Sequence, residues 1–189
     1  MERRRRLLGS LGLLTLGLAV AVALLPPIPQ DPLYHRFADS RPLLGIPNFL
    51  NVVSNLPLFV VGLLGLLHLV LHRREDFADQ RESRAYMIFF FGTVLIACGS
   101  AWYHLAPDND RLFWDRLPMA VAFMAFTAAM LAERVSATFG SRALLPLLTA
   151  GAASVTWWRL GVPARAQALL RRAEALGPSD PGDLLREVR

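Results

Sequence analysis

Long apolar stretches separated by short charged segments run through most of the chain. Three are long, at residues 7–28, 48–72 and 85–103, and two shorter ones follow at residues 117–131 and 143–158. A helix needs about 20 mostly apolar residues to cross the hydrocarbon core of a bilayer. A soluble protein of this length has no means of burying several helices that are apolar all round. The pattern therefore predicts an all-α, polytopic helical membrane protein with about five transmembrane helices.

Two of these stretches carry additional signals. Pro57 interrupts the second, and the first follows four arginines at positions 3–6 and contains an Ala-Val-Ala sequence. Basic residues before such a stretch are also typical of a cleavable signal peptide. The apolar part is longer than the roughly 7–15 residues of a signal-peptide core, so we expect a retained span.

Charge refines this picture. The chain has 20 Lys+Arg and 15 Asp+Glu residues, for a formal net charge of +5, and it contains no lysine. A basic balance can indicate nucleic-acid binding. The arginines are confined to the N-terminus, short connecting segments and the C-terminal part, which membrane topology explains better. We therefore expect membrane lipid, and no nucleic acid, as the partner.

The arginines also predict an orientation. Residues 3–6 favour a cytoplasmic N-terminus in a multi-pass integral membrane protein, because cytoplasmic segments carry the excess of Arg. Residues 73–84 would then lie on the cytoplasmic side, and residues 29–47 and 104–116 on the opposite side. After a fifth span, this alternation would place the arginines of residues 159–189 outside, against the rule.

The composition changes after Trp158. Residues 1–158 are predicted to form a membrane-embedded helical domain. Residues 159–189 are rich in Ala, Arg, Leu, Gly and Pro and have no long apolar run. We expect them to form an Arg-rich polar tail that is disordered or lies at the membrane interface, with an amphipathic pattern over residues 164–176.

Candidate chemistry gathers on one side of the predicted membrane. Ser100 and His104 are four residues apart and share a helix face, and Asp115 opens the next span. Ionisable residues at membrane depth are costly and indicate a functional site by default. A neutral His can ligate zinc, a carboxylate can orient that ligand or accept a proton, and a hydroxyl can donate to an oxyanion. The same residues could instead hydrogen-bond between helices.

Further polar residues flank this cluster. Asn51, Ser54 and Asn55 occupy adjoining positions near the same side of the membrane and are possible supporting residues. His68 and His72 form a His-x3-His pair, but they lie at the other end of the same span, next to two arginines. Most of the bilayer thickness would separate this pair from His104, so we expect it to belong to no common metal site.

Three segments carry a resemblance to a known family. Residues 99–109 read GSAWYHLAPDN, residues 114–119 read WDRLPM, and residues 48–56 read NFLNVVSNL. Together they resemble the alkaline ceramidase family, which belongs to a superfamily of seven-helix membrane zinc hydrolases that includes the progestin/adiponectin receptors. The resemblance extends from about residue 34 to residue 134.

The resemblance implies a zinc-dependent amidase that hydrolyses the N-acyl bond of ceramide-like lipids to a sphingoid base and a fatty acid. His104 would be one of three histidine ligands of Zn²⁺. Ser100 and Asp115 would be its catalytic partners, and the lipid would enter from the membrane.

The chain departs from the family pattern at the remaining ligands. The family takes two further histidines from a His-x3-His pair in the last of seven spans, whereas this sequence has no histidine after His104 and about five spans. A catalytic zinc ion needs three protein ligands, so we expect impaired activity. The missing ligands and the change after Trp158 predict a chain that is truncated or frame-shifted at its C-terminus. His35 is the only other histidine on the side of His104.

Two other interpretations remain open. One is a non-catalytic lipid-binding or receptor-like membrane protein, which would bind lipid without turnover. The other is a small transporter subunit with Asn51, Asn55 and Asp115 along a polar path, although no inverted repeat of the kind common in transporters is evident.

Overall fold

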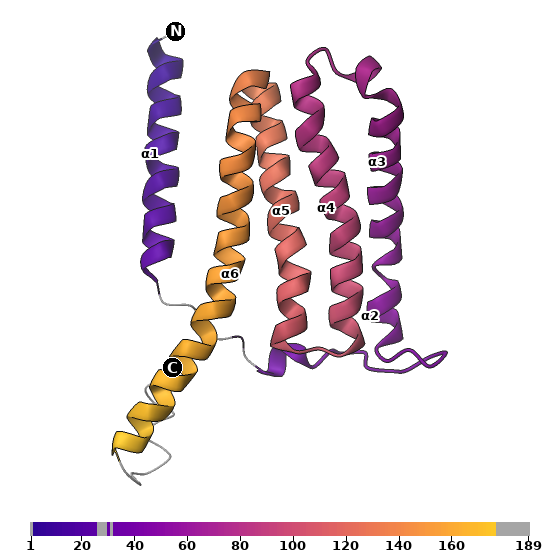
Figure 1. Ribbon diagram of the computed structural model, residues 1–189, viewed down its shortest axis with the longest axis vertical. Coiled ribbons are helices and arrows are strands. Elements are labelled where there is room, and N and C mark those ends of the chain that lie inside the picture. Colours follow the sequence, from indigo (N-terminus) through magenta and orange to yellow (C-terminus); the bar gives the residue numbers. More distant parts are fainter. Residues whose placement is uncertain (1, 26–29, 31, 177–189) are drawn as a thin grey trace. The chain divides into compact units, whose positions relative to one another are not determined.

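The described part of the chain is helical, as expected. The computed structural model describes residues 2–25, 30 and 32–176, and no strand occurs among them (Figure 1). The elements are α1 (Glu2–Leu24), the short 3-10 helix η1 (Pro32–His35), α2 (Phe49–Val53), α3 (Leu56–Asp76), α4 (Gln80–Leu105), α5 (Asn109–Arg134) and α6 (Ala137–Leu176). The predicted all-α class is confirmed.

Three segments are long and apolar enough to cross a bilayer. They are Phe49–His72, Gln80–Leu105 and Asn109–Arg134, and they match three of the predicted spans. The other two expected spans lie in α1 and in α6, apart from residues 26–28, which fall outside the described residues. The chain is therefore a helical membrane protein by length and composition of its helices.

The chain divides into two compact units. One comprises Gln30–Arg159, with α2 to α5 and the first part of α6, and the other comprises Met1–Pro29 with Leu160–Arg189. Helix α6 continues past Trp158 to Leu176, so residue 158, the predicted end of the membrane domain, lies within a helix. The boundary between two domains at residue 158 stays a prediction. Residues 177–189 of the expected polar tail lie outside the described residues.

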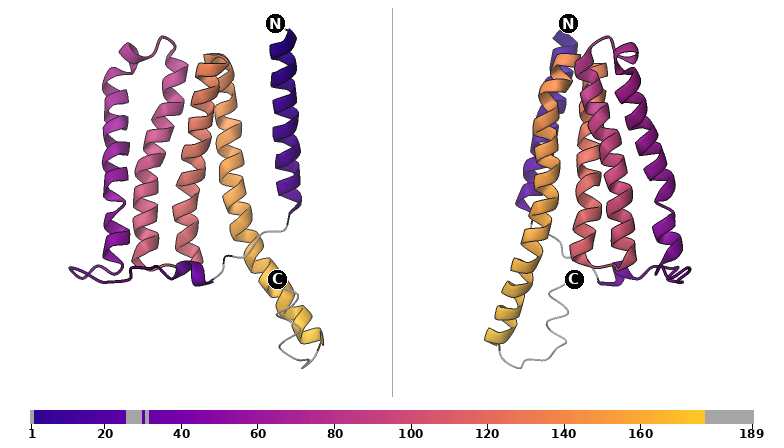
Figure 2. Two further views of the ribbon diagram at one scale, coloured as in Figure 1. Left: turned by 180° about the vertical axis from the view of Figure 1, so that it is seen from behind. Right: turned by 45° about the vertical axis from the view of Figure 1, so that its right-hand side comes forward.

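Within the larger unit, α3, α4 and α5 lie side by side, with α4 between its two neighbours (Figure 2). Each helix runs antiparallel to the next because the connections are short. Aspartates begin two of the helices: the Asp79 side chain accepts a hydrogen bond from the Arg81 backbone N–H, and Asp108 accepts one from that of Arg111. Such caps satisfy N–H groups that have no partner within the helix.

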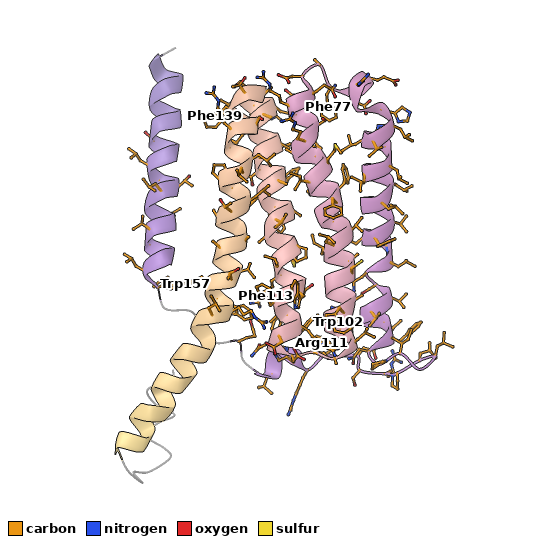
Figure 3. The ribbon with its side chains drawn as sticks, viewed as in Figure 1. Phe77, Trp102, Arg111, Phe113, Phe139 and Trp157 are labelled. Atoms are coloured by element: carbon orange, nitrogen blue, oxygen red, sulfur yellow. The ribbon has the colours of Figure 1, made fainter. Side chains whose placement is uncertain are left out.

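Aromatic side chains lie near both ends of these helices. Phe77 and Phe139 are at one end, and Trp102, Phe113 and Trp157 are toward the other (Figure 3). Aromatic residues are enriched where a membrane protein meets the two interfaces of the bilayer. The placement agrees with helices that span a membrane.

The second predicted span is broken into α2 and α3. Pro57 stands in the first turn of α3, and its nitrogen has no hydrogen to donate to the preceding turn. The chain restarts at Asn55, whose carbonyl accepts a 3.0 Å hydrogen bond from the Phe59 N–H. The interruption expected from Pro57 thus falls immediately before the proline.

Small residues let α4 and α5 approach closely. The core contains Ala125, Ala128 and Ala129 of α5, which are fully buried. Without a hydrophobic drive between helices in lipid, association depends on packing at small residues. One close approach is at Gly99, where an added β-carbon would lie 2.3 Å from the Trp114 carbonyl oxygen.

The sequence explains why that carbonyl is available. In a regular helix it would accept from the N–H four residues later, but Pro118 stands there and has none. Pro118 lies inside α5. Gly99 of α4 therefore faces the Trp114 carbonyl of α5, which has no helical donor because of Pro118. Since glycine has no side chain, the two backbones can come into contact there.

Replacing Gly99 with Ala is expected to destabilise the protein, because the new methyl group must push α4 away from Trp114. Overpacking of this kind costs about 1–3 kcal/mol of unfolding free energy. Thermal unfolding in detergent, followed by circular dichroism, measures the loss. Gly12→Ala is the control, since no described atom lies within 4 Å of the β-carbon it adds. Equal unfolding temperatures for the two variants would contradict the close-contact explanation.

Candidate functional site

The structure brings Ser100, His104 and Asp115 together where α4 ends and α5 begins. Ser100 and His104 are one turn apart in α4, and Asp115 lies in α5. The Ser100 hydroxyl lies close enough to the Asp115 carboxylate to interact with it. Asp115 is also close enough to His104 and Arg116 for attraction between their charges. The antiparallel connection between α4 and α5 thus joins the residues that the sequence placed on one side of the membrane.

His104 has an unusual environment for a polar side chain. Its Nδ1 atom is buried and has no hydrogen-bond partner among the described residues. The ring lies 4.7 Å from that of Phe37 and 5.1 Å from that of Tyr103, measured between centroids. Buried polar atoms are nearly always paired, and an exception calls for an explanation such as an ion or a catalytic role. In the tautomer protonated at Nε2, Nδ1 would have a lone pair suited to ligating a metal.

The complete zinc site implied by the resemblance does not fit the described residues. No group of three or more His, Cys, Asp or Glu side chains among them is arranged to hold a metal ion. Catalytic zinc takes three protein ligands and one water or substrate. His104 and Asp115 can therefore provide part of a metal site, but not a closed one.

His35 lies near His104 but is engaged elsewhere. Its Nδ1 is 2.9 Å from the Tyr103 hydroxyl and its Nε2 is 3.0 Å from Asn109 Oδ1. An amide oxygen only accepts hydrogen bonds, so Nε2 is the donor in this pair. His35 thereby ties η1 to the end of α4 and the start of α5.

Asn48 holds the end of α4 at His104. Its Nδ2 donates a 2.8 Å hydrogen bond to the His104 backbone carbonyl, one of the last carbonyls of a helix, which have no intrahelical donor. The Asn48 backbone is left-handed, with φ of 49°. Asn tolerates this conformation better than most residues. Asparagine therefore provides both the left-handed backbone and the side-chain donor at this position.

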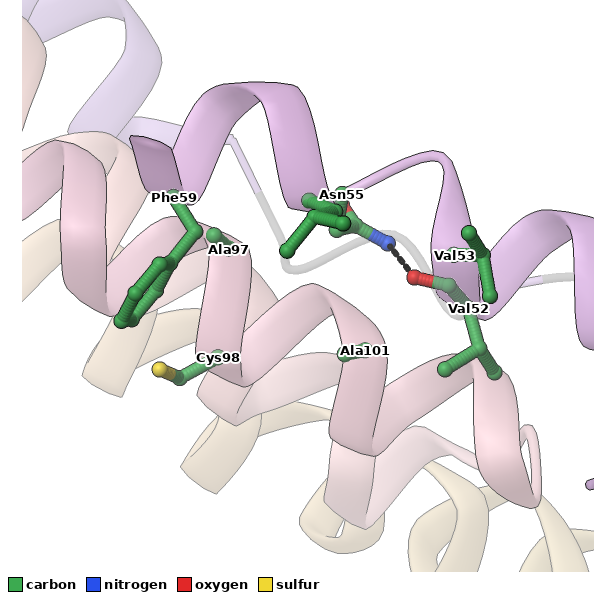
Figure 4. Close-up of a pocket in the computed structure, with 8 residues that line it drawn as sticks. Val52, Val53, Asn55, Phe59, Ala97, Cys98 and Ala101 are labelled. Carbon is green, nitrogen blue, oxygen red and sulfur yellow. Dashed lines mark hydrogen bonds between the residues drawn. The ribbon is translucent and has the colours of Figure 1, made fainter. Parts of the chain in front are cut away.

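The side chains of Ser54 and Asn55 make their hydrogen bonds at the break between α2 and α3, whereas the Asn51 side chain donates to the Asp39 carbonyl in the segment before α2. Asn55 Nδ2 donates to the carbonyls of Asn51 (2.9 Å) and Val52 (3.3 Å), the second of which is drawn in Figure 4. Ser54 Oγ also donates to the Asn51 carbonyl, at 2.9 Å. These side chains satisfy backbone groups that the helix break exposes, and their part in the site stays a prediction.

An apolar cavity of about 290 Å³ lies beside this break. Val52, Phe59, Ala97 and Cys98 are among the residues that line it, together with Asn55 (Figure 4). The cavity separates α2 and the start of α3 from α4. His104 is not among the residues that line it.

His68 and His72 lie near the end of α3 that is remote from the site, as the sequence predicts. His68 Nε2 is 2.8 Å from Asp76 Oδ2, and the two imidazole rings stack with centroids 4.8 Å apart. His72 Nδ1 lies 3.3 Å from the His68 carbonyl oxygen. Their hydrogen bonds stay within α3, so the structure does not bring this pair to His104.

An exposed ion pair organises the segment before α2. Arg41 donates to Asp39 through Nε at 2.9 Å, Nη2 at 3.0 Å and its backbone N–H at 3.1 Å. These side-chain and backbone hydrogen bonds lower the pKa of Asp39 to about 2. The Asp39 carbonyl accepts a hydrogen bond from Asn51 Nδ2 at 2.6 Å, which connects this segment to α2.

Sequence patterns did not indicate the roles of Phe37, Tyr103 and Asn48. Asn48 stands inside a segment that carries the family resemblance, which is the one signal that could have singled it out. Tyr103 stands inside another such segment, at residues 99–109. Phe37 lies outside all three segments, and its contact with the end of a helix follows no periodic pattern of residues.

Fold and site together define a multi-pass helical membrane protein with a Ser, a His and an Asp gathered inside its spans. The Ceramidase family model matches residues 45–170, about two thirds of the chain, and the chain belongs to this family. Membership supports a ceramidase-like hydrolase. No curated protein matches the chain, and neither does any solved structure.

Two substitutions at Asn48 separate its two contributions. Asn48→Gly removes the side-chain bond to His104, worth about 1 kcal/mol, and keeps the left-handed backbone. Asn48→Ala also forces an alanine into that conformation, at about 1–2 kcal/mol more. Thermal unfolding should rank wild type above Asn48→Gly above Asn48→Ala. The reverse order for the two variants would contradict this account.

Arg41→Gln is expected to raise the pKa of Asp39 from about 2 toward its ordinary value of 3.8. Since the folded-state pKa lies below the unfolded one, the stabilisation by Asp39 is complete above the ordinary value and is lost as the pH falls through the folded pKa. The carboxyl ¹³C shift of Asp39, followed by NMR against pH, measures the change. Arg36→Gln, at an exposed neighbouring position, should leave the titration unchanged; an equal shift there would argue against specific pairing.

Proposed function

We propose that Ser100, His104 and Asp115 form part of the hydrolytic site of a zinc-dependent, ceramidase-type amidase that acts on the N-acyl amide of ceramide-like lipids. One observation carries the proposal: the buried Nδ1 of His104 has no described partner, and Asp115 is close enough to act on His104 through its charge. Membership of the Ceramidase family supports the same reading.

The substrate class follows from where the site lies. Ser100 and His104 belong to the span Gln80–Leu105, and Asp115 belongs to Asn109–Arg134. A water-soluble amide would have to leave water to reach them, whereas a membrane lipid would already have its chains in the bilayer. A lipid whose amide lies just below its head group would bring the scissile bond to the depth of these residues.

Each residue has a role that suits amide hydrolysis. The Asp115 carboxylate can accept a proton from an attacking water, as a general base. The Ser100 hydroxyl, which lies near Asp115, can donate to the developing oxyanion of the amide. His104 would contribute its Nδ1 lone pair as one zinc ligand, and Asn48 would hold the helix end that carries it.

The polypeptide supplies one of the three histidine ligands that a catalytic zinc site needs. His35 is bound to Tyr103 and Asn109, and His68 and His72 lie elsewhere. We therefore propose that this polypeptide alone binds zinc weakly and hydrolyses ceramide slowly or not at all.

The proposed orientation keeps the arginines of residues 3–6 in the cytoplasm. The connection between α3 and α4 then lies on the cytoplasmic side, and the site lies toward the opposite side. The excess of arginine in the predicted cytoplasmic segments supports this arrangement.

The proposal predicts a specific pattern of metal binding. Full-length protein purified in detergent and dialysed against micromolar zinc should hold less than stoichiometric zinc by elemental analysis. His104→Ala and Asp115→Asn should lower the zinc content further, because each removes a group beside the metal. His68→Ala is the matched control, since its nearest polar partner is Asp76, and should leave zinc content unchanged.

The same preparations should be assayed for release of fatty acid from ceramide. Turnover at or near background is expected for wild type and variants alike. Stoichiometric zinc and robust turnover, both abolished by His104→Ala, would overturn the proposed impairment. Zinc content that responds equally to His68→Ala and His104→Ala would overturn the site assignment. Ceramide binding that ignores both chelators and these substitutions would favour a non-catalytic lipid-binding protein.

A further inference from the structure

A second apolar space lies between α4 and α5. Its volume is about 500 Å³, and its lining includes Cys98 and Trp102 of α4 and Trp114, Leu117 and Val121 of α5. Pockets that bind small molecules fall in the range of about 300–1,000 Å³. The lining is almost entirely apolar, and we call this space the α4–α5 groove.

The groove is separate from the candidate hydrolytic site. Successive residues of an α-helix are about 100° apart around its axis, so Cys98 and Trp102 project from the side of α4 opposite Ser100. Ser100 is not among the residues that line the groove, and neither is His104. An occupant of the groove would therefore not be positioned for attack at that site.

The position of the groove indicates the chemistry of its occupant. Both helices belong to membrane-spanning segments, so the surroundings of an apolar groove between them are acyl chains. Trp102 and Trp114, at one end of its lining, have 50% and 55% of their surface exposed. Tryptophan gathers where acyl chains meet head groups, so this end of the groove lies at the interface.

A cationic group stands at that end. The Arg111 guanidinium carbon lies 4.3 Å from the Trp102 ring centroid, and Figure 3 shows the two residues at the same end of the helices. Arg111 Nε is 3.7 Å from Asp108 Oδ2, a loose ion pair, and the Arg111 side chain is 27% exposed. Stacking on an indole holds the planar guanidinium in place, with N–H groups available to a phosphate.

We propose that the α4–α5 groove binds a phospholipid with an anionic head group, its acyl chain along Trp114, Leu117 and Val121 and its phosphate at Arg111. Arginine suits this task because its planar fork binds phosphate oxygens in pairs. The apolar lining of the groove matches the acyl chain of such a lipid. The Arg111 guanidinium, held on Trp102, matches its phosphate. The proposal is independent of the hydrolytic function.

Native mass spectrometry of the full-length protein tests the proposal. Protein in mild detergent would be incubated with equal amounts of phosphatidylglycerol and phosphatidylcholine of the same acyl chains, and retained lipid would be counted. Wild type should retain phosphatidylglycerol in preference. Arg111→Gln should lower its retention about fivefold, the effect of one basic residue near an anionic membrane surface. Arg111→Lys keeps the charge without the paired geometry and should give an intermediate loss.

Matched variants show whether the groove itself is used. Val121→Phe fills part of the groove and should lower retention of both lipids. Val60→Phe adds the same bulk at an exposed position of α3, and Arg142→Gln removes an exposed charge from α6; neither should change retention. Circular dichroism would verify equal helix content for every variant used.

Three results would overturn the proposal. They are equal retention of the two lipids by wild type, a preference unchanged by Arg111→Gln, and retention unaffected by Val121→Phe. If Arg142→Gln lowers retention as much as Arg111→Gln, the binding is a general effect of charge and the groove is not the site.

Discussion

The close approach of α4 and α5 at Gly99 is the constraint on which the rest of the site depends. Gly99 faces the Trp114 carbonyl, where an added β-carbon would come within 2.3 Å, and Pro118 removes the donor that this carbonyl would otherwise have in its own helix. Ser100 follows Gly99 and Asp115 follows Trp114 in sequence. A contact between two backbones therefore sets the distance between a hydroxyl and a carboxylate. A larger residue at position 99 would separate the chemistry as well as the helices.

A second set of contacts fixes the end of α4. Asn48 holds the His104 carbonyl, His35 bonds to Tyr103 and Asn109, and Phe37 packs on the His104 ring. These residues satisfy the polar groups around His104 but leave its Nδ1 without a described partner. Several interactions therefore fix the end of the helix that carries His104. That arrangement is consistent with the proposed role of His104 as a metal ligand.

The proposed site and the proposed lipid groove lie on two different faces of this pair of helices. Ser100 and His104 lie on one side of α4, and the groove toward Trp102 and Trp114 lies on the other. Because the same glycine contact joins α4 to α5 behind both faces, site and groove share one support. Arg111 and Arg116, a little over one turn apart in α5, illustrate the division: the first stacks on Trp102, while the second lies over Trp158 and Tyr34.

Sequence alone determined the membrane class, the positions of three of the five predicted spans, and the grouping of Ser100, His104 and Asp115. Apolar length, helical spacing and residue type are properties of the chain. The sequence also showed that the histidines are too few and too scattered for a three-histidine site, which is a matter of counting and topology. Only the tertiary structure decided that Asn48, His35 and Phe37 surround the end of α4, and that Gly99 meets the carbonyl exposed by Pro118. These contacts join segments far apart in sequence through a left-handed residue, a loop and a helix end, and no periodic pattern encodes where such segments meet.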